Sequence, residues 1–320
     1  MLKGTSEVVR GPVGERMGEI PLGGRRSART SNRGYWWFLV PAVFGVVGLI
    51  VIPLGFTAYY SLRNYNLQLG TNSFIGLANY FAALTGGDPD FLASLVRTIV
   101  YVVVVITLDF VIAMTEALLI FGMKTGAARF WRAVFLLPIL IIPTASAVFW
   151  QTIMYAPHDG EFLTVLGLSN LIPPPLGSPQ LAFWAIIITV IWAWSPWVFL
   201  LLSAGLDGLD MSVIEAGMVD GASYFQRLRY IILPLMRPVI FITLAFKALD
   251  SFLSFPFVWV MTQGGPGGST HLLSTYIYQK AFQFLDYGSG SALAILMLII
   301  GGGLALVVVL IWQRFYGKEF

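Results

Sequence analysis

The chain has 320 residues, of which 57% are hydrophobic and only 11% carry a charged side chain, and its formal net charge is +3. Because a soluble protein has roughly 25% charged residues, this composition excludes a soluble enzyme, a disordered chain and a nucleic-acid-binding protein, and it predicts an integral membrane protein. The absence of cysteine excludes disulfide bonds and thiol-ligated metals. The two histidines, His158 and His271, are too few for a histidine-rich metal site, so no metal is expected.

The first 34 residues are predicted to form a basic, mobile tail on the cytoplasmic side. They carry seven lysines and arginines and show no hydrophobic periodicity. The apolar run that begins at Tyr35 is too long for the hydrophobic region of a secretory signal. We therefore expect it to be retained as the first membrane span, within one membrane domain over residues 35–320.

Six long apolar segments follow one another along this domain. A helix needs about 20 apolar residues to cross the hydrocarbon core of a membrane, and the segments are apolar all round, unlike the alternating strands of a membrane barrel. They run over Tyr35–Leu62, Leu92–Phe121, Trp131–Tyr155, Leu181–Ala204, Val239–Thr262 and Ser291–Gln313. The sequence therefore predicts an all-α membrane protein with six transmembrane helices.

The lysines and arginines predict the orientation of these helices. Fifteen lie on the side of the two termini and of the links between the second and third and between the fourth and fifth segments, whereas three lie on the other side. Cytoplasmic links carry the excess of positive charge in membrane proteins. Both termini and the link over residues 205–238 are therefore expected on the cytoplasmic side.

The link over residues 205–238 is longer than an antiparallel helix pair requires. Ser212 with Glu215, and Ser223 with Gln226, each have the spacing of a capping box, in which two side chains satisfy free amides at a helix start. Two short helices are therefore predicted in this link.

These two helices are expected at Val213–Val219 and Tyr224–Ile232, with a sharp turn at Gly221 and a stop at Pro234. Their apolar side chains suit a groove on a partner protein. The alternative is a connector that lies on the membrane surface.

The same link carries a spaced pattern. It reads Glu215-Ala216-Gly217, then Gly221, then Ile231 and Leu233-Pro234. This pattern resembles the signature of the permease subunits of bacterial ABC importers of the carbohydrate-uptake class, with Gly217 in place of an alanine. The resemblance assigns contact with an ATPase to Glu215, Ala216, Gly217, Asp220, Gly221, Ile231, Leu233 and Pro234.

Two further stretches narrow the resemblance, which covers Tyr35 to Phe320. Thr262-Gln263-Gly264-Gly265-Pro266, followed by Ser269-Thr270, is similar to a turn in the first of the two paired permeases of sugar importers, the F-type subunit of maltose permease. The stretch from Phe74 to Tyr80 is also similar to that class.

The resemblance implies a multi-pass subunit of a bacterial or archaeal cytoplasmic membrane, embedded in lipid. Its expected partners are a second related permease, two cytoplasmic ATPases and an extracytoplasmic solute-binding protein. ATP and Mg are expected on the ATPases, with no cofactor on this chain and no nucleic acid. The sequence has no Gly-Lys-Ser/Thr phosphate loop, which agrees with an external energy source.

Four ionisable residues lie within the predicted spans, where each costs roughly 2.5–3.5 kcal/mol on insertion scales. Asp109 and Glu116 share one face of the second span, and a structural role is favoured for both. Lys247 and Asp250 are close enough in the fifth span to pair. They form either a structural pair or part of a substrate pathway, in which they would bind sugar hydroxyls.

Other residues are candidates for the same pathway. Pro256 interrupts the fifth span, and broken helices often frame transport sites, although kinks also occur without a site. Aromatic rings can stack on sugars, yet ordinary helix packing also explains a tryptophan cluster. The candidates are Ser251, Ser254, Phe255, Trp192, Trp194 and Trp197.

Two other kinds of protein fit the sequence less well. An ion-coupled secondary transporter would use the intramembrane carboxylates as a relay, but it has no need of a two-helix cytoplasmic link. An intramembrane enzyme would need a metal or nucleophile motif, and neither His-Glu-x-x-His nor Gly-x-Ser-x-Gly occurs. The sequence thus predicts the permease subunit of an ATP-driven, binding-protein-dependent importer for a carbohydrate, with a mostly neutral set of spans that argues against an anionic cargo.

Overall fold

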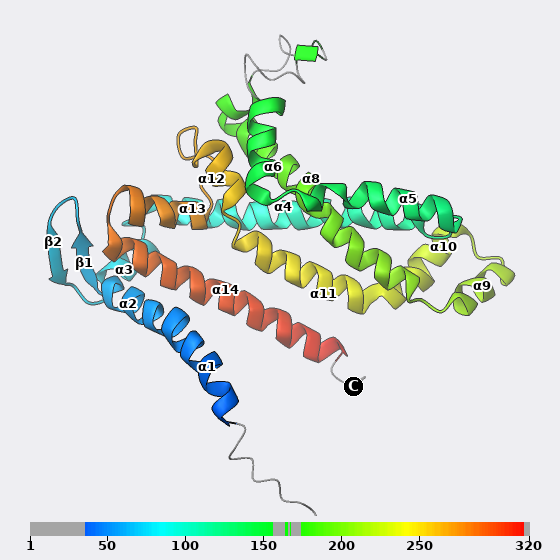
Figure 1. Cartoon of the computed structure of the whole chain (residues 1–320), viewed down its shortest axis with the longest axis horizontal. Helices are drawn as coiled ribbons and strands as arrows, with labels where there is room; N and C mark the ends of the chain where they lie inside the picture. The colour runs from blue at the N-terminus through cyan, green and yellow to red at the C-terminus, as the bar shows by residue number, and fades with distance from the viewer. Residues whose placement is uncertain (1–35, 156–163, 166, 168–173, 317–320) are drawn as a thin grey trace, which may run out of the picture. The chain divides into compact units, whose positions relative to one another are not determined.

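A computed structural model describes residues 36–155, 164–165, 167 and 174–316, and Figure 1 shows its helices and strands. The predicted tail over residues 1–34 and His158 lie outside the described residues. The chain divides into two units, residues 1–51 and 52–320.

In the first unit, the described part is one helix. It consists of α1 (Trp36–Val46), which contains Pro41, and the π-helical turn η2 (Val47–Val51). Its sequence is apolar throughout, so it has no polar stripe that would suit a surface helix of a soluble protein.

The second unit begins with α2 and ends with α14. Its first half contains α2 (Ile52–Ser61), β1 (Arg63–Asn66), β2 (Thr71–Phe74), α3 (Ala78–Leu84), α4 (Pro89–Ile120), α5 (Thr125–Leu136), η3 (Leu137–Leu140), α6 (Pro143–Phe149) and η4 (Trp150–Met154). Its second half contains η5 (Pro175–Gly177), α8 (Pro179–Asp207), α9 (Met211–Val219), α10 (Tyr224–Arg227), η6 (Leu228–Ile232), α11 (Leu233–Phe252), α12 (Pro256–Thr262), α13 (Leu273–Tyr278), η7 (Gln279–Gln283) and α14 (Tyr287–Tyr316).

Five continuous helices are long and apolar enough to cross a membrane within the described residues. They are Val40–Ser61, Pro89–Ile120, Pro179–Asp207, Tyr224–Phe252 and Tyr287–Phe315. A sixth candidate is a pair of helices bent by 90°. The predicted number of spans therefore holds if the bent pair counts as one span.

The predicted continuous third span, Trp131–Tyr155, is wrong in shape. The chain breaks at Ile141 and Ile142, which are extended, and the legs Thr125–Leu140 and Pro143–Met154 meet at 90°. Pro143 supplies the reason, because the ring of a proline pushes the preceding residue out of the helical region.

The predicted fifth span, Val239–Thr262, begins and ends in the wrong places. One helix runs from Tyr224 to Phe252, and α12 is separate. Pro234 does not stop the helix as expected, since it lies inside the continuous helix, directly after the π-helical turn η6. A π-helical turn departs from the regular α-helical hydrogen-bond ladder, so the helix passes this proline without a break. Only the break before Pro256 ends the span.

A small hairpin was not expected from the sequence, which predicted helices alone. The strands β1 and β2 pair antiparallel, with Arg63 opposite Phe74. Two residues of the stretch Phe74–Tyr80 lie in α3 and tie it to the end of α2: the Asn79 amide donates to the Ser61 carbonyl at 2.9 Å, and the Tyr80 hydroxyl donates to the Ser61 hydroxyl at 2.7 Å.

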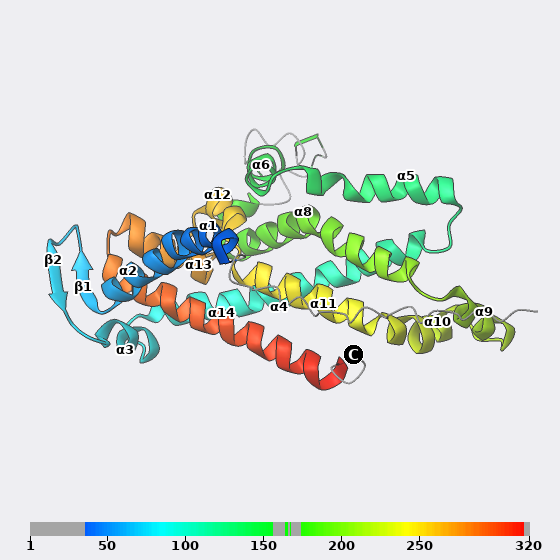
Figure 2. The same ribbon diagram turned by 60° about the horizontal axis from the view of Figure 1, so that its bottom comes forward.

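The core of the second unit surrounds α8. This helix is the most buried of the candidate spans within the chain, and it packs along α4 and α11. Figure 2 shows α4, α8 and α11 running side by side, with α13 and the hairpin toward one end of this unit and α9 at the other. Two apolar clusters fill this core, one around Tyr101 and Ile187 and one around Phe199 and Met236.

Candidate functional site: the link between α8 and α11 and an intramembrane charge cluster

The link between α8 and α11 contains the first predicted helix as α9. It begins at Met211, two residues before the predicted start, because Asp210 rather than Ser212 caps it. The Asp210 carboxylate accepts a hydrogen bond from the Ser212 amide at 2.9 Å. The pKa of Asp210 is lowered by hydrogen bonds from the Ser212 hydroxyl and amide.

The second helix of the link begins as the sequence predicts. Ser223 and Gln226 form a capping box, in which the Ser223 amide donates to Gln226 Oε1 at 2.7 Å and the Gln226 amide donates to Ser223 Oγ at 3.4 Å. The preceding turn uses Gly221 with a φ of +80°, which only glycine adopts without strain. From here the helix continues without interruption into α11.

The residues of the spaced pattern divide into two groups. Gly217 is buried, and a Cβ on it would lie 2.6 Å from the end of the Ile231 side chain. Ile231 and Leu233 pack against the cluster around Phe199, and Pro234 lies beside them in α11. The others, Glu215, Ala216, Asp220 and Gly221, are exposed. One group therefore closes α9 onto the spans, and the other stays on the surface.

Large apolar side chains accompany the exposed group. Val219 is 88% exposed and Phe225 is 78% exposed. Beside them, a shallow depression of about 360 Å³ is lined by residues that include Gly221, Gln226 and Tyr230. Isolated exposed apolar residues are common, but this group surrounds a hollow at the tip of a short helix pair.

The intramembrane charges form a cluster of three. Lys247 Nζ lies 3.1 Å from Asp109 Oδ2 and 3.7 Å from Asp250 Oδ2. The side chains of Lys247 and Asp109 are buried, whereas that of Asp250 is 51% exposed. The sequence predicts the Lys247–Asp250 neighbours, but it does not predict the shorter pair that joins α4 to α11.

The other predicted pathway residues separate into different places. Lys247 lies 5.3 Å from the centre of the Trp194 ring, so Trp194 belongs to the charge cluster. Trp192 instead packs against Phe149 and Trp150, and Trp197 packs against the cluster around Phe199. Successive helix positions turn by about 100°, which places the three rings on different faces of α8.

The serines near the break in span five differ from one another. Ser251 is buried, and its hydroxyl has no hydrogen-bond partner among the described residues. Ser254 shares a hydrogen bond of 3.2 Å with the hydroxyl of Tyr101 and accepts one from Ser274 at its carbonyl. Phe255 stacks on Trp259 with ring centres 5.6 Å apart.

Glu116 lies two turns from Asp109 on α4. It is half-buried, and its Oε2 has no hydrogen-bond partner in the part of the chain that the structure describes. It does not join the cluster around Lys247.

Comparison with known proteins decides the family. Residues 119–318 match the family described as "Binding-protein-dependent transport system inner membrane component". The chain belongs to this family. It is therefore the membrane-embedded translocation subunit of an ABC importer, a multi-pass permease, and ATP hydrolysis resides on a separate subunit.

Curated relatives match the permease over almost its whole length. A probable ABC transporter permease, y4oQ of Sinorhizobium fredii, is 31% identical and covers 94% of this chain and 96% of its own. The trehalose/maltose transport system permease MalF of Thermococcus litoralis is 32% identical, and the match covers 85% of this chain and 90% of MalF. These matches confirm the resemblance to carbohydrate-uptake permeases.

A solved structure shares the fold of the permease. It is a chain of a bacterial ABC transporter involved in the import of the acidic polysaccharide alginate, and it aligns with a TM-score of 0.77 over 89% of this chain and 96% of that chain. At 18% identity, this likeness concerns the fold alone. The family also removes the reason to treat the permease as an ion-coupled secondary transporter.

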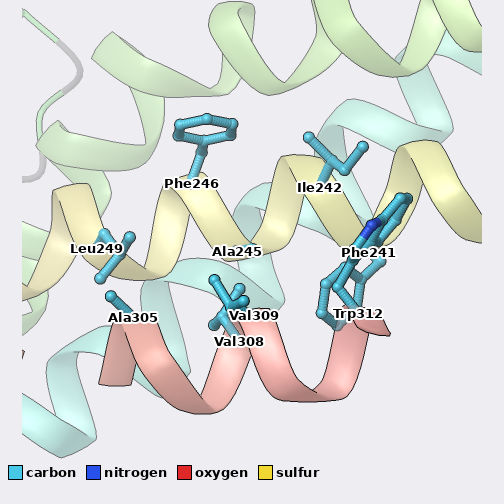
Figure 3. A pocket seen from close by; sticks show the side chains of 9 residues that line it. All are labelled: Phe241, Ile242, Ala245, Phe246, Leu249, Ala305, Val308, Val309 and Trp312. Carbon is cyan, nitrogen blue, oxygen red and sulfur yellow. The ribbon is translucent and has the colours of Figure 1, made fainter. Parts of the chain in front are cut away.

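The permease also has an apolar groove that was not predicted. It lies between α11 and α14, has a volume of about 450 Å³, and is shown in Figure 3. Phe241 and Trp312 lie with their rings 5.6 Å apart at one end, and Leu249 and Ala305 lie at the other. The groove is continuous with exposed Phe246, so this side of α11 presents an apolar surface beside Asp250.

Proposed function

We propose that this permease imports an uncharged carbohydrate delivered by an extracytoplasmic solute-binding protein. The names of its relatives support this cargo, since they include permeases for trehalose/maltose, trehalose and starch degradation products. The spans support it as well, because the Lys247 ammonium lies between the carboxylates of Asp109 and Asp250 and so offers no unpaired positive charge to an anionic cargo.

The exposed tip of the link between α8 and α11 is the observation that carries the coupling part of this proposal. Val219, Phe225 and Tyr224 expose apolar side chains around Gly221, and such a helix pair suits a groove on a partner. An ATPase subunit that binds this tip moves it when ATP closes the ATPase pair. Because α10, η6 and α11 form one helix, movement of the tip passes directly to the span that carries Lys247 and Asp250.

The exposed carboxylate of Asp250 supports the placement of the pathway along α11. A charge that faces lipid within a membrane-spanning helix is costly, and Asp250, in the last turn of the span Tyr224–Phe252, is half-exposed on the surface of this chain. We place this surface against the second permease, where the two subunits enclose a polar pathway. Ser251, Ser254, Phe255 and the tryptophans of α8 are assigned to the pathway or to the packing behind it.

The assembly follows from these assignments. The permease lies in a bacterial or archaeal cytoplasmic membrane with both termini and the link on the cytoplasmic side. A second related permease and two ATPases complete the complex, and the ATPases hold ATP and Mg.

Val219→Glu tests the coupling. This side chain is almost fully exposed, so a carboxylate there leaves the fold intact but opposes an apolar docking site. We expect the ATPases to be lost from the purified complex and sugar uptake to cease. Leu69→Glu, at an exposed apolar residue of the hairpin, is the matched control and keeps the ATPases bound. Retention of the ATPases and full uptake by Val219→Glu would contradict the proposal.

A further inference from the structure

A polar cavity lies at the end of the second unit opposite the α9–α10 tip. Its volume is about 260 Å³, and it is enclosed by the first turns of α4, the turn after α12, and the segment α13–η7. The other end of α4 packs with α9 in the cluster around Phe199. In the orientation of the proposed function, the cavity therefore faces the extracytoplasmic side.

The turn that contains Gly264-Gly265-Pro266 builds one wall of the cavity. Thr270 holds the turn closed, with its hydroxyl 2.7 Å from that of Thr262 and donating to the Gly265 carbonyl at 2.8 Å. The ring of His271 lies directly over Gly264, where a Cβ would come within 2.0 Å of it. The turn is thus shaped around His271, which lines the cavity.

Arg97 joins α4 to this wall. Its Nη1 donates to the His271 carbonyl at 3.1 Å, which fixes the guanidinium at the cavity and uses one of its five donors. Ser94 and Asp90 lie one and two turns, respectively, before Arg97 on the same face of α4, and both also line the cavity.

The charges around the cavity balance. Lys280 Nζ lies 3.4 Å from Asp88 Oδ2, and the Tyr276 hydroxyl donates to Asp88 Oδ1 at 2.6 Å. Asp90 supplies the negative charge near Arg97. Burial, and then the charge of Arg97, lower the pKa of His271, so its imidazole is neutral at pH 7. This balance of charges favours neither an anionic nor a cationic ligand in the cavity.

One polar group at the cavity has no partner. Ser94 is 1% exposed, and its hydroxyl forms no hydrogen bond with the described residues. A buried hydroxyl without a hydrogen bond costs about 1–3 kcal/mol, and buried polar groups are otherwise almost always paired. The other polar groups that line the cavity include a donor in Arg97, an acceptor in Asp90, and Gln279, which can donate and accept.

The size and rim of the cavity restrict the ligand further. Its volume lies just below the roughly 300–1,000 Å³ of pockets for drug-sized ligands, so it admits one ring rather than a chain. Phe284 lines it and is 47% exposed. An aromatic ring at the edge of a polar cavity can stack on the C–H face of a sugar.

We propose that this cavity binds one uncharged sugar ring at the outer face of the permease, at a site separate from the charge cluster around Lys247. Ser94, Arg97 and Gln279 bond its hydroxyls, and Phe284 covers one face. The inference rests on the proposed function for the carbohydrate cargo and for the orientation. In this proposal, the turn that contains Gly264-Gly265-Pro266 forms one wall of the sugar site.

The test uses the assembled transporter without its binding protein, in nanodiscs. Binding of maltose, trehalose and glucose is measured by saturation-transfer NMR for the wild type and for Arg97→Gln and Ser94→Ala. Arg97→Gln retains a donor for the His271 carbonyl. Loss of one or two hydrogen bonds, each about 1 kcal/mol, is expected to weaken sugar binding about 5- to 30-fold. Arg129→Gln, on exposed α5, is the matched control and leaves binding unchanged.

The alternative outcomes separate the two proposals. Sugar binding that resists both Arg97→Gln and Ser94→Ala, in variants that melt at the wild-type temperature, would overturn the outer site while leaving carbohydrate import intact. If Arg97→Gln abolishes capture of the binding protein and leaves sugar binding unchanged, the cavity instead receives an acidic side chain, which also overturns the sugar site. If the transporter neither binds nor imports any sugar with its binding protein present, the proposed cargo itself is wrong.

Discussion

Lys247 shows how a charge is accommodated inside a membrane-spanning helix. Its ammonium lies against Asp109 from another span and over the ring of Trp194. The cost of desolvating each buried ion is offset only while the other ion is present. The pair therefore stabilises the contact between α4 and α11 only if both residues keep their charges. Asp250 is the more distant carboxylate and stays free to face a second polar surface.

Lys247→Met is predicted to destabilise the permease more than the double variant Asp109→Asn/Lys247→Met. The single change leaves the Asp109 carboxylate buried without a counter-charge, at a cost of about 3–5 kcal/mol, whereas the double change removes both charges. Thermal unfolding of the purified protein in detergent measures the difference. Equal destabilisation in the two variants would contradict this prediction, because it would show that the buried Asp109 carboxylate carries no penalty when Lys247 is absent.

The turn after α12 has a backbone conformation that requires glycine at particular positions. Gly264 has a φ of +87° and supports the His271 ring, whereas Gly267 has a φ of +59° and open space around it. Both positions favour glycine for the backbone, but only Gly264 is also a close packing contact. The two glycines therefore provide a matched pair for separating conformational strain from steric exclusion.

Gly264→Ala is predicted to reduce the folded yield far more than Gly267→Ala. At Gly267 an alanine meets only the cost of the left-handed conformation, roughly 1–2 kcal/mol. At Gly264 the added methyl also displaces His271 and breaks the wall that Arg97 holds. Folded yield and unfolding temperature in detergent measure this, and similar losses in the two variants would refute the steric argument.

At the scale of the whole molecule, one face of the permease suits neither water nor lipid. The face of α11 that carries Ile242, Phe246 and Asp250 combines exposed apolar groups with an exposed carboxylate. The groove in Figure 3 borders this face. Since a carboxylate exposed on a membrane-spanning helix is unfavourable in lipid, this combination fits the contact with the proposed second permease.

Co-expression with the second permease is accordingly predicted to raise the unfolding temperature of this chain, because a partner that binds only the folded state stabilises it. Phe246→Ala should reduce that gain, whereas Leu298→Ala, at an exposed residue of α14 outside the groove lining, should not. Unfolding followed by fluorescence at fixed protein concentration provides the measurement. A gain unaffected by Phe246→Ala would place the partner elsewhere.

The sequence alone determined the features that depend on neighbours along the chain. Apolar length located the spans, the Ser223–Gln226 spacing located a helix start, and the spacing from Glu215 to Pro234 led to the family. These signals are local, because capping, hydropathy and glycine turns act within a few residues. The Lys247–Asp250 neighbours follow from helix geometry for the same reason.

Only the tertiary structure decided which distant groups meet. It paired Asp109 with Lys247 and placed Arg97 beside His271. Such contacts depend on which helix faces pack together, and an apolar helix that is hydrophobic all round carries no stripe to indicate its packed face. Packing among the spans chooses those faces, and with them the residues of the proposed pathway.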